Sequence, residues 1–271
     1  MALLNISFTE HEIASFLNRI NVTRSKVSVH FLKSIVSGIL EYIPFQNFSM
    51  LTNEWIRPSE AMIKKDMLSG LGGLCTVRNP FLHQFLKALG FEVRFASATM
   101  LEPDCHISLI VTIEGNDWWV DVGNGYPYMD PIQLGDENMK SNWFMDYKLV
   151  LVDGRFYVHH KSQNKDWEMN HHFSPEGVAY SVFDQMHHLH YSVPGWGPFL
   201  TGLRVNRFWK YGGIIIRDER TYSPDGEGAV TSVNELTTFL KKWFPNPGFV
   251  ESIDVIKADR LWRKTHMEVY G

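Results

Sequence analysis

The sequence predicts an α+β fold in three consecutive parts: a helical part at residues 1–90, a β-rich part at residues 91–195 and a mixed α/β part at residues 196–271. Apolar residues recur at helical spacing up to Gly90 and at strand spacing after it. Several strand patterns then follow one another without helices between them, which is typical of an antiparallel sheet. We therefore expect an N-terminal helical bundle, a central antiparallel β-barrel or sheet, and a C-terminal α/β unit.

Three helices are expected in the first part. Thr9 is placed to cap the first helix, because Glu12 follows it at the spacing of a capping box. The second helix covers about residues 28–42, and Pro44 prevents its continuation. The third is an apolar stripe that follows Cys75.

The third helix has two possible starting points. If it begins at Asn79-Pro80, the asparagine is its cap and the proline occupies the first helical position. If it begins at Cys75, Pro80 lies near its first turn and must be accommodated with some strain. The sequence leaves both starts open.

Strand patterns dominate the second part. Polar and apolar residues alternate, β-branched residues are frequent, and polar turns separate the segments. The clearest hairpin signal is the turn Asp153-Gly154 between two such segments. The expected strands are residues 91–95, 106–113, 118–122, 147–152, 155–158 and 213–217, and a further helix is expected at residues 233–243.

Composition and charge exclude several classes of function. The 271 residues carry a formal net charge of −4, so no overall positive field exists to hold nucleic acid or an anionic membrane surface. No apolar run approaches the length of about 18 residues that a transmembrane helix needs, and the first residues lack a signal-peptide pattern. Two cysteines, Cys75 and Cys105, are too few for a disulfide framework. We expect a cytoplasmic protein with neither nucleic-acid nor membrane partners.

Cys75 is a candidate nucleophile. Glycines at three of the positions in SGLGGLC (residues 69–75) allow tight backbone just ahead of it. A cysteine at the start of a helix lies near free amide N–H groups and the positive end of the helix dipole, which favour the thiolate. No Gly-Lys-Ser/Thr follows, so a phosphate-binding loop is excluded. The alternative is a small buried cysteine that only packs.

A nucleophilic cysteine needs a base, and the base needs an orienting group. His106 begins one expected strand and Asp121 ends the next, so a hairpin would bring both near one end of the pair. Asp121 would then hold the imidazole tautomer while His106 faces Cys75. Considered one at a time, His106 could also be an ordinary strand histidine and Asp121 an ordinary turn residue at the end of a strand.

Four blocks together resemble the arylamine N-acetyltransferases. They are PFQN (residues 44–47), GGLC (residues 72–75), His106 at the start of an apolar strand, and DVGNG (residues 121–125). The family patterns are Pro-Phe-Glu-Asn, Arg-Gly-Gly-x-Cys, His, and Asp-Val/Ala-Gly-Phe-Gly. VPGWGPF (residues 193–199) is similar to the family's Pro-x-Ser-x-Phe stretch. The resemblance implies three domains with the boundaries given above, the last a lid, around a Cys-His-Asp core like that of cysteine proteases.

The resemblance also implies a ping-pong acetyl transfer. Cys75 would take an acetyl group from acetyl-CoA as a thioester and pass it to an amine, hydrazine or hydroxylamine nitrogen. His106 would keep Cys75 as a thiolate and assist proton transfer, and Asp121 would orient His106. Backbone N–H groups, including that of Cys75, would hold the thioester oxyanion. Acetyl-CoA is then the acyl donor, a small amine is the acceptor, and no metal is required.

The chain departs from the family pattern at four positions. Gln46 replaces the glutamate and Leu71 the arginine of what looks like a structural ion pair, and losing both avoids an unpaired charge. Val77 stands where the family often has glutamate. Asn124 replaces an aromatic residue of a loop expected to line the acceptor pocket, which favours a more polar acceptor.

Three residues are expected to bind the acceptor. Gly123 and Asn124 belong to the loop that follows Asp121, and Cys105 borders the pocket. Because Cys105 precedes His106 in sequence, strand alternation predicts that its side chain points away from Cys75.

Histidines cluster at residues 159–160, 171–172 and 187–190, and we expect solvated or packing roles for them. No His-Glu-x-x-His motif occurs, so no functional metal is predicted. Three alternative functions remain open. They are an amide synthase that uses a carrier-bound acyl chain, a thioester hydrolase or transglutaminase-like enzyme, and a non-catalytic binding protein that retains the fold.

Overall fold

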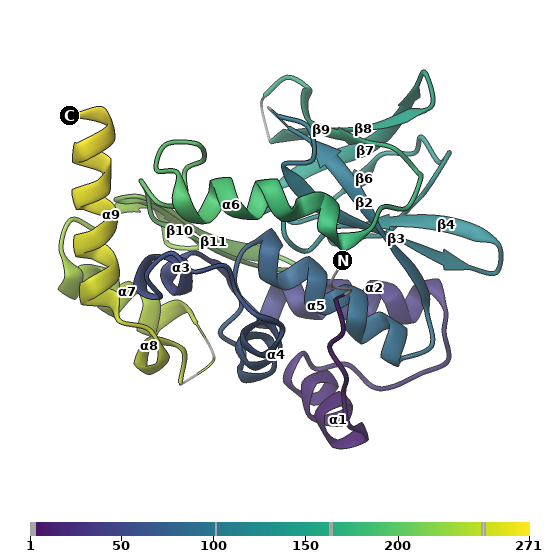
Figure 1. Cartoon of the computed structure of the whole chain (residues 1–271), viewed down its shortest axis with the longest axis horizontal. Helices are drawn as coiled ribbons and strands as arrows, with labels where there is room; N and C mark the ends of the chain where they lie inside the picture. Colours follow the sequence, from purple (N-terminus) through teal and green to yellow (C-terminus); the bar gives the residue numbers. More distant parts are fainter. Residues whose placement is uncertain (1–3, 101, 163–164, 245, 247) are drawn as a thin grey trace.

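The computed structural model describes residues 4–100, 102–162, 165–244, 246 and 248–271. Helices dominate the chain up to Ala88, strands follow from Glu92 to Phe173, and helices and strands together make up the rest of an α+β fold whose helices pack around antiparallel sheets (Figure 1). The helices are α1 (Glu10–Arg19), α2 (Val29–Tyr42), α3 (Phe48–Thr52), α4 (Glu60–Ser69), α5 (Cys75–Ala88), the 3-10 helix Tyr180–Phe183, α6 (Asp184–Ser192), α7 (Val233–Trp243), α8 (Phe249–Ser252) and α9 (Val255–Tyr270).

The strands fall into two sheets within the described residues, one of eight strands in the order β5-β4-β3-β2-β9-β8-β7-β6 and one of five in the order β1-β10-β11-β12-β13. Their bounds are β1 (Phe45–Gln46), β2 (Glu92–Thr99), β3 (His106–Ile113), β4 (Asn116–Val120), β5 (Ile132–Gln133), β6 (Lys140–Ser141), β7 (Met145–Val152), β8 (Arg155–Ser162), β9 (Glu168–Phe173), β10 (Arg204–Trp209), β11 (Gly212–Arg217), β12 (Arg220–Ser223) and β13 (Gly226–Ala229).

The helix starts follow local capping chemistry. The predicted capping box of α1 is confirmed: the Thr9 hydroxyl accepts from the backbone N–H of Glu12, and the Glu12 carboxylate accepts from the backbone N–H of Thr9. α2 ends at Tyr42, before Pro44, as predicted. The predicted helix at residues 233–243 is α7, which has a second capping box built on Ser232.

The start of α5 settles the two alternatives for the third helix. α5 begins at Cys75, so the interpretation of Asn79-Pro80 as its start is wrong. Pro80 lies inside the helix and has no N–H, which leaves the carbonyl of Thr76 without its usual helical donor. Burial of most of α5, from Cys75 to Leu86, supplies packing that offsets this loss.

Both predicted hairpins form with two-residue turns. Asp153-Gly154 has positive φ at both residues, 48° and 77°, and joins β7 to β8. Glu114-Gly115, with φ of 50° and 77°, joins β3 to β4, so β4 begins slightly earlier than the alternation predicts.

The first and second parts of the chain share one hydrophobic core. Phe81 and Phe85 of α5 are stacked, with ring centroids 5.6 Å apart, and Phe16 of α1 packs edge-on against them. Ile107 and Leu109 of β3 belong to the same buried cluster. The helices therefore hold one face of the large sheet.

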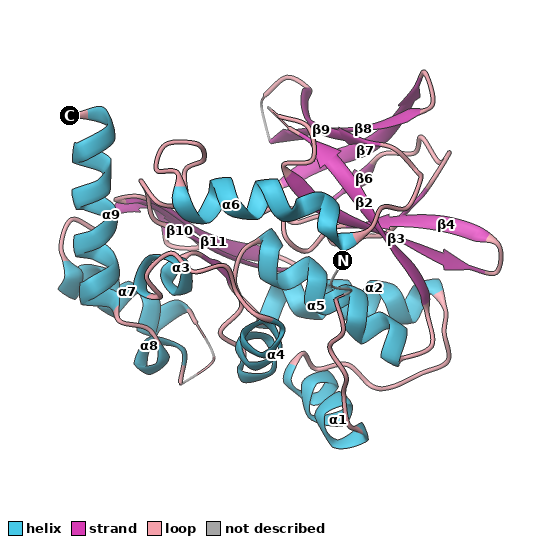
Figure 2. Cartoon of the chain, in the orientation of Figure 1, coloured by secondary structure: helices cyan, strands magenta, loops and turns pink. Residues whose placement is uncertain are grey.

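The first part is also joined to the third. β1 pairs with β10, and the Asn47 side chain donates to the carbonyls of Phe199 and Gly202, both at 2.7 Å. Figure 2 shows α7, α8 and α9 gathered at the end of the molecule away from β7, β8 and β9. The predicted domain boundaries after residues 90 and 195 stay predictions. No helix among the described residues is long and apolar enough to cross a bilayer.

Candidate active site

Three elements bring Cys75, His106 and Asp121 together. Cys75 is the first residue of α5, His106 is the first residue of β3, and Asp121 directly follows β4. The β3–β4 register, with Leu109 opposite Val120, brings the start of one strand beside the end of the other. The predicted hairpin therefore forms, and its open end meets the N-terminus of α5.

The three side chains form one buried, hydrogen-bonded cluster. His106 Nε2 lies 2.6 Å from Asp121 Oδ2. The side chain of His106 is 4% exposed and that of Asp121 is 0% exposed. His106 also shares a hydrogen bond with Cys75. The other carboxylate oxygen of Asp121 accepts from the backbone N–H of Gly123 at 2.8 Å. Asp121 is thus fixed on one side and faces the imidazole on the other.

Asn79 is a further member of this cluster that the sequence analysis missed. It is fully buried, and its Nδ2 donates to Asp121 Oδ1 at 2.9 Å and to the carbonyl of Ile107 at 2.5 Å. Its Oδ1 accepts from the backbone N–H of Val122 at 3.1 Å. Asn79 lies one helical turn after Cys75, but the sequence alone does not show that Ile107 and Asp121 lie beside it.

Proton equilibria in the cluster favour a charged pair. Burial alone would lower the pKa of His106, but the Asp121 carboxylate and Cys75 outweigh burial and hold this pKa well above 6.5. Burial would likewise raise the pKa of Asp121, yet His106 and Asn79 hold it below 3.8. An imidazolium beside a carboxylate is therefore the resting arrangement near neutral pH.

The raised pKa of His106 predicts how stability depends on pH. Because the folded pKa lies above the unfolded value of 6.5, the contribution of His106 is complete below that value and is lost as pH rises through the folded pKa. The Asp121 contribution is lost only in acid, as pH falls through a pKa below 3.8. The difference in unfolding free energy between wild type and His106→Gln should be largest at about pH 5–6 and narrow toward alkaline pH.

Urea unfolding at a series of pH values measures this difference. His30→Gln changes an exposed histidine and is the matched control, with a small and constant difference expected. A His106→Gln difference that grows toward alkaline pH would show that His106 is neutral in the folded protein.

The cluster opens into a cavity of about 240 Å³. Cys75 and His106 line it, together with the three predicted acceptor-binding residues, Cys105, Gly123 and Asn124. Its other lining residues are Met100, Glu102, His190, Trp196, Gly197, Pro198 and Phe199.

Cys105 lines the same cavity as Cys75. Because β3 begins at His106, strand alternation does not fix the direction of the Cys105 side chain, and the predicted direction away from Cys75 stays a prediction. The thiol of Cys105 accepts from the backbone N–H of Met100 at 3.3 Å.

Asn124 is held by the neighbouring strand β9. Its Nδ2 donates to Asn170 Oδ1 at 2.9 Å, and the same oxygen lies 2.7 Å from His171 Nδ1. The His171 ring is fully buried, 5.3 Å from the ring of His106. Burial lowers the pKa of His171 to about 3, so this ring stays neutral beside the charged one.

Gln46 and Leu71, which replace the family's ion pair, are also in contact, through an uncharged hydrogen bond. The side chain of Gln46 is buried, and its Nε2 donates to the carbonyl of Leu71 at 3.3 Å and to Ser49 Oγ at 2.9 Å. An amide-to-backbone contact therefore connects these positions. Across the described ranges, no group of three or more His, Cys, Asp or Glu side chains could hold a metal ion.

A family profile described as N-acetyltransferase matches residues 28–245, which is most of the chain. This match assigns the protein to the N-acetyltransferase class. Within that class, the chain belongs to the arylamine N-acetyltransferase family, whose members are enzymes.

Relatives and solved structures agree with this assignment. The chain is 27% identical to arylamine N-acetyltransferase 2 of Mus musculus over 160 residues, 54% of this chain and 55% of that protein. The structure is similar to the arylamine N-acetyltransferase of Salmonella typhimurium, with TM-score 0.77, 20% identity, and coverage of 88% and 92% of the two chains. It is also similar to that of Mycobacterium marinum in complex with CoA, with TM-score 0.80, 17% identity, and coverage of 93% and 99%.

The two comparisons differ in extent. In sequence, the chain spans about half the length of the curated relatives that it matches, the Mus musculus protein among them. In structure, it spans nearly the whole of the neighbours, which shows that the fold is shared.

Proposed function

We propose that the protein transfers an acetyl group from acetyl-CoA to the nitrogen of a small arylamine or hydrazine by a ping-pong mechanism through a Cys75 thioester. The observation that carries this proposal is the buried pair of His106 and Asp121 in contact with Cys75, at the wall of a cavity. Family membership supports the reaction class, and the CoA complex of the Mycobacterium marinum protein supports the acyl donor.

In the first half-reaction, the Cys75 sulfur attacks the thioester carbonyl of acetyl-CoA. A carbon–sulfur bond to Cys75 forms, the bond to the CoA sulfur breaks, and the imidazolium of His106 supplies the proton with which CoA leaves as a thiol. Leu74, the N-cap of α5, makes no side-chain capping bond. The first N–H groups of α5, that of Cys75 among them, are therefore suited to hold the oxyanion.

In the second half-reaction, the acceptor nitrogen attacks the acetyl-Cys75 carbonyl. The new carbon–nitrogen bond displaces the Cys75 thiolate, and neutral His106 takes the proton from nitrogen, which restores the starting charges. Asp121 stabilises the imidazolium that forms and fixes its tautomer. His106, Cys75 and Asp121 are thus the proposed catalytic residues.

The acceptor meets a mainly apolar and aromatic wall. Trp196 and Phe199 offer ring faces, and Glu102 lies at the same cavity. Gly123 and Asn124 would contact the acceptor beside the nucleophile, with Cys105 at the border. A flat ring that carries a nucleophilic nitrogen fits such a wall, and no metal is required for the chemistry.

Intact-protein mass spectrometry after mixing with acetyl-CoA, without acceptor, tests the proposal. Wild type should gain one acetyl group, and Cys75→Ala should gain none. Cys105→Ala is the matched control, because it removes the other cysteine of the cavity and should retain the adduct. Addition of an arylamine should then remove the acetyl group from the wild type.

Other outcomes would identify the alternatives. Release of CoA without an adduct would indicate a thioester hydrolase. Reaction with a carrier-bound acyl chain but not with acetyl-CoA would indicate an amide synthase, and no reaction with either would indicate a binding protein. A cytoplasmic location, with acetyl-CoA and the amine as the partners, completes the proposal.

A further inference from the structure

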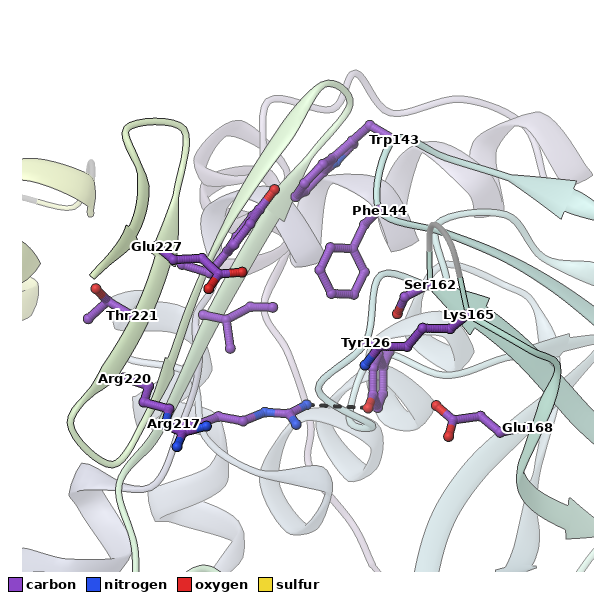
Figure 3. A pocket seen from close by; sticks show the side chains of 12 residues that line it. Tyr126, Trp143, Phe144, Ser162, Lys165, Glu168, Arg217, Arg220, Thr221 and Glu227 are labelled. Atoms are coloured by element: carbon purple, nitrogen blue, oxygen red, sulfur yellow. Dashed lines mark hydrogen bonds between the residues drawn. The ribbon is translucent and has the colours of Figure 1, made fainter. Parts of the chain in front are cut away.

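A second cavity, of about 560 Å³, lies between the two sheets (Figure 3). One wall is built by β8, β9 and the segment before β7, and the other by β11, β12 and β13. It shares no lining residue with the cavity of Cys75. Acetyl transfer as proposed above makes no use of it.

Flat aromatic rings form one side of this cavity. Trp143 and Tyr222 are stacked, with centroids 6.2 Å apart and planes at 12°. Phe144 packs edge-on against Tyr222 at 6.3 Å and 71°. Such an arrangement offers both ring faces and ring edges to a planar ligand.

Three cationic side chains also line the cavity: Arg217, Arg220 and Lys165. In the described part of the chain, none of the three forms a salt bridge with a carboxylate, whereas nearby Arg204 is paired with Asp218 at 2.7 Å. Figure 3 shows Arg217 and Lys165 reaching from opposite walls toward Tyr126. None of these three positive charges is therefore paired directly with a carboxylate.

Arg217 is held in position by contacts that do not neutralise its charge. Its Nη2 donates to the hydroxyl of Tyr126 at 3.3 Å, and its guanidinium lies 5.7 Å from the centre of the Tyr126 ring. A neutral hydroxyl occupies one N–H group and leaves the other donors of the guanidinium fork free.

The charge balance of the lining limits the charge of a ligand. Glu168 and Glu227 also face the cavity, and Glu168 lies 3.0 Å from His160. Against the three cations, these two carboxylates leave a single net positive charge. The lining is thus matched to a monoanion and not to a polyphosphate.

We propose that this cavity binds an aromatic monocarboxylate. The ring lies against the stack of Trp143 and Tyr222, and the carboxylate is received by the guanidinium of Arg217 in a two-point hydrogen bond. Because the chain continues from Asn124, in the wall of the Cys75 cavity, to Tyr126, in the wall of this one, occupancy is expected to stabilise the connecting loop.

Isothermal titration calorimetry with three matched probes tests the proposal. Benzoate has both an aromatic ring and a negative charge. Benzamide has the aromatic ring without the charge, and cyclohexanecarboxylate has the charge without an aromatic ring. For the wild type, benzoate should bind at least about tenfold more tightly than either of the others, since a charge-assisted bidentate contact and ring stacking both contribute.

Arg217→Gln should bring the affinity for benzoate down to that for benzamide. Arg260→Gln removes the same charge at an exposed position outside the cavity and should bind benzoate like the wild type. Cys75→Ala should also bind normally, so the result does not depend on the acetyl-transfer proposal.

Three results would overturn the proposal. They are equal affinity for benzoate and benzamide in the wild type, unchanged benzoate binding by Arg217→Gln, and displacement of benzoate by 3′,5′-ADP. The last result would assign the cavity to the nucleotide end of the acyl donor instead.

Discussion

Replacement of Asp121 by asparagine is expected to slow acetyl transfer about 10⁴-fold, the cost of the same change in a catalytic triad. Oδ1 of Asp121 accepts from Asn79 and Gly123, so the asparagine carbonyl takes over that position. The amide NH₂ group then faces His106 Nε2 in place of a carboxylate oxygen. An amide donor forces Nε2 to act as an acceptor, so the proton moves to the ring nitrogen that should serve Cys75.

Loss of the carboxylate also removes the charge that keeps the pKa of His106 high. The rate of Cys75 alkylation by iodoacetamide, measured against pH, should therefore fall at neutral pH in Asp121→Asn. Asp225→Asn, at an exposed position paired with Lys242, is the control and should behave like the wild type. If Asp121→Asn retained both turnover and the alkylation profile, Asp121 would have only a structural role.

The proposed catalytic residues were predictable because local rules fix their positions. A two-residue turn at Glu114-Gly115 sets the register of β3 against β4, and that register brings His106 near Asp121. The position of Cys75 follows from the glycines before it, since Gly72 has φ of +76° and approaches the carbonyl of Pro44 too closely for a side chain.

Asn79 could not be predicted, because its role depends on tertiary contacts. Asn-Pro is a good helix start by local chemistry, and the actual start at Cys75 is stabilised by burial of α5 and by hydrogen bonds from Asn79 to β3 and to Asp121. These bonds join residues distant in sequence. Local helix propensity therefore favours a start at Asn79-Pro80, although the start at Cys75 is the more stable one in the folded protein.

Helices α3, α4, α6, α8 and α9 were missed for a related reason. α6 has the sequence DQMHHLHYS, whose buried face includes the polar rings of His187 and His190, so it has no apolar stripe. α9 is largely polar, and a contact with the distant helix α3, from Lys257 Nζ to the carbonyl of Thr52 at 2.8 Å, helps to hold it. The walls of the Cys75 cavity that α6 and the segment after it supply were therefore not foreseen in detail.

Substitution of Gly123 by alanine is expected to reduce the free energy of unfolding by about 1–3 kcal/mol, as overpacking of a buried site does. A Cβ atom at Gly123 would lie 2.6 Å from Cys75 Cα and 2.6 Å from Asn79 Nδ2. Both neighbours belong to α5, which is buried and cannot move away cheaply. The loop after Asp121 must shift instead.

Such a shift changes the chemistry as well as the stability, because the backbone N–H of Gly123 fixes the Asp121 carboxylate. A displacement on the order of 1 Å at the reacting groups should cost about 10²-fold in kcat/KM. Gly248→Ala is the control, since a Cβ there meets its nearest atom at 3.7 Å, an ordinary contact. Urea unfolding and acetyl-transfer kinetics on both variants measure the two effects. Loss of stability with unchanged kcat/KM would show that the loop moves without carrying Asp121 with it, and the carboxylate would then be held by Asn79 and His106 alone.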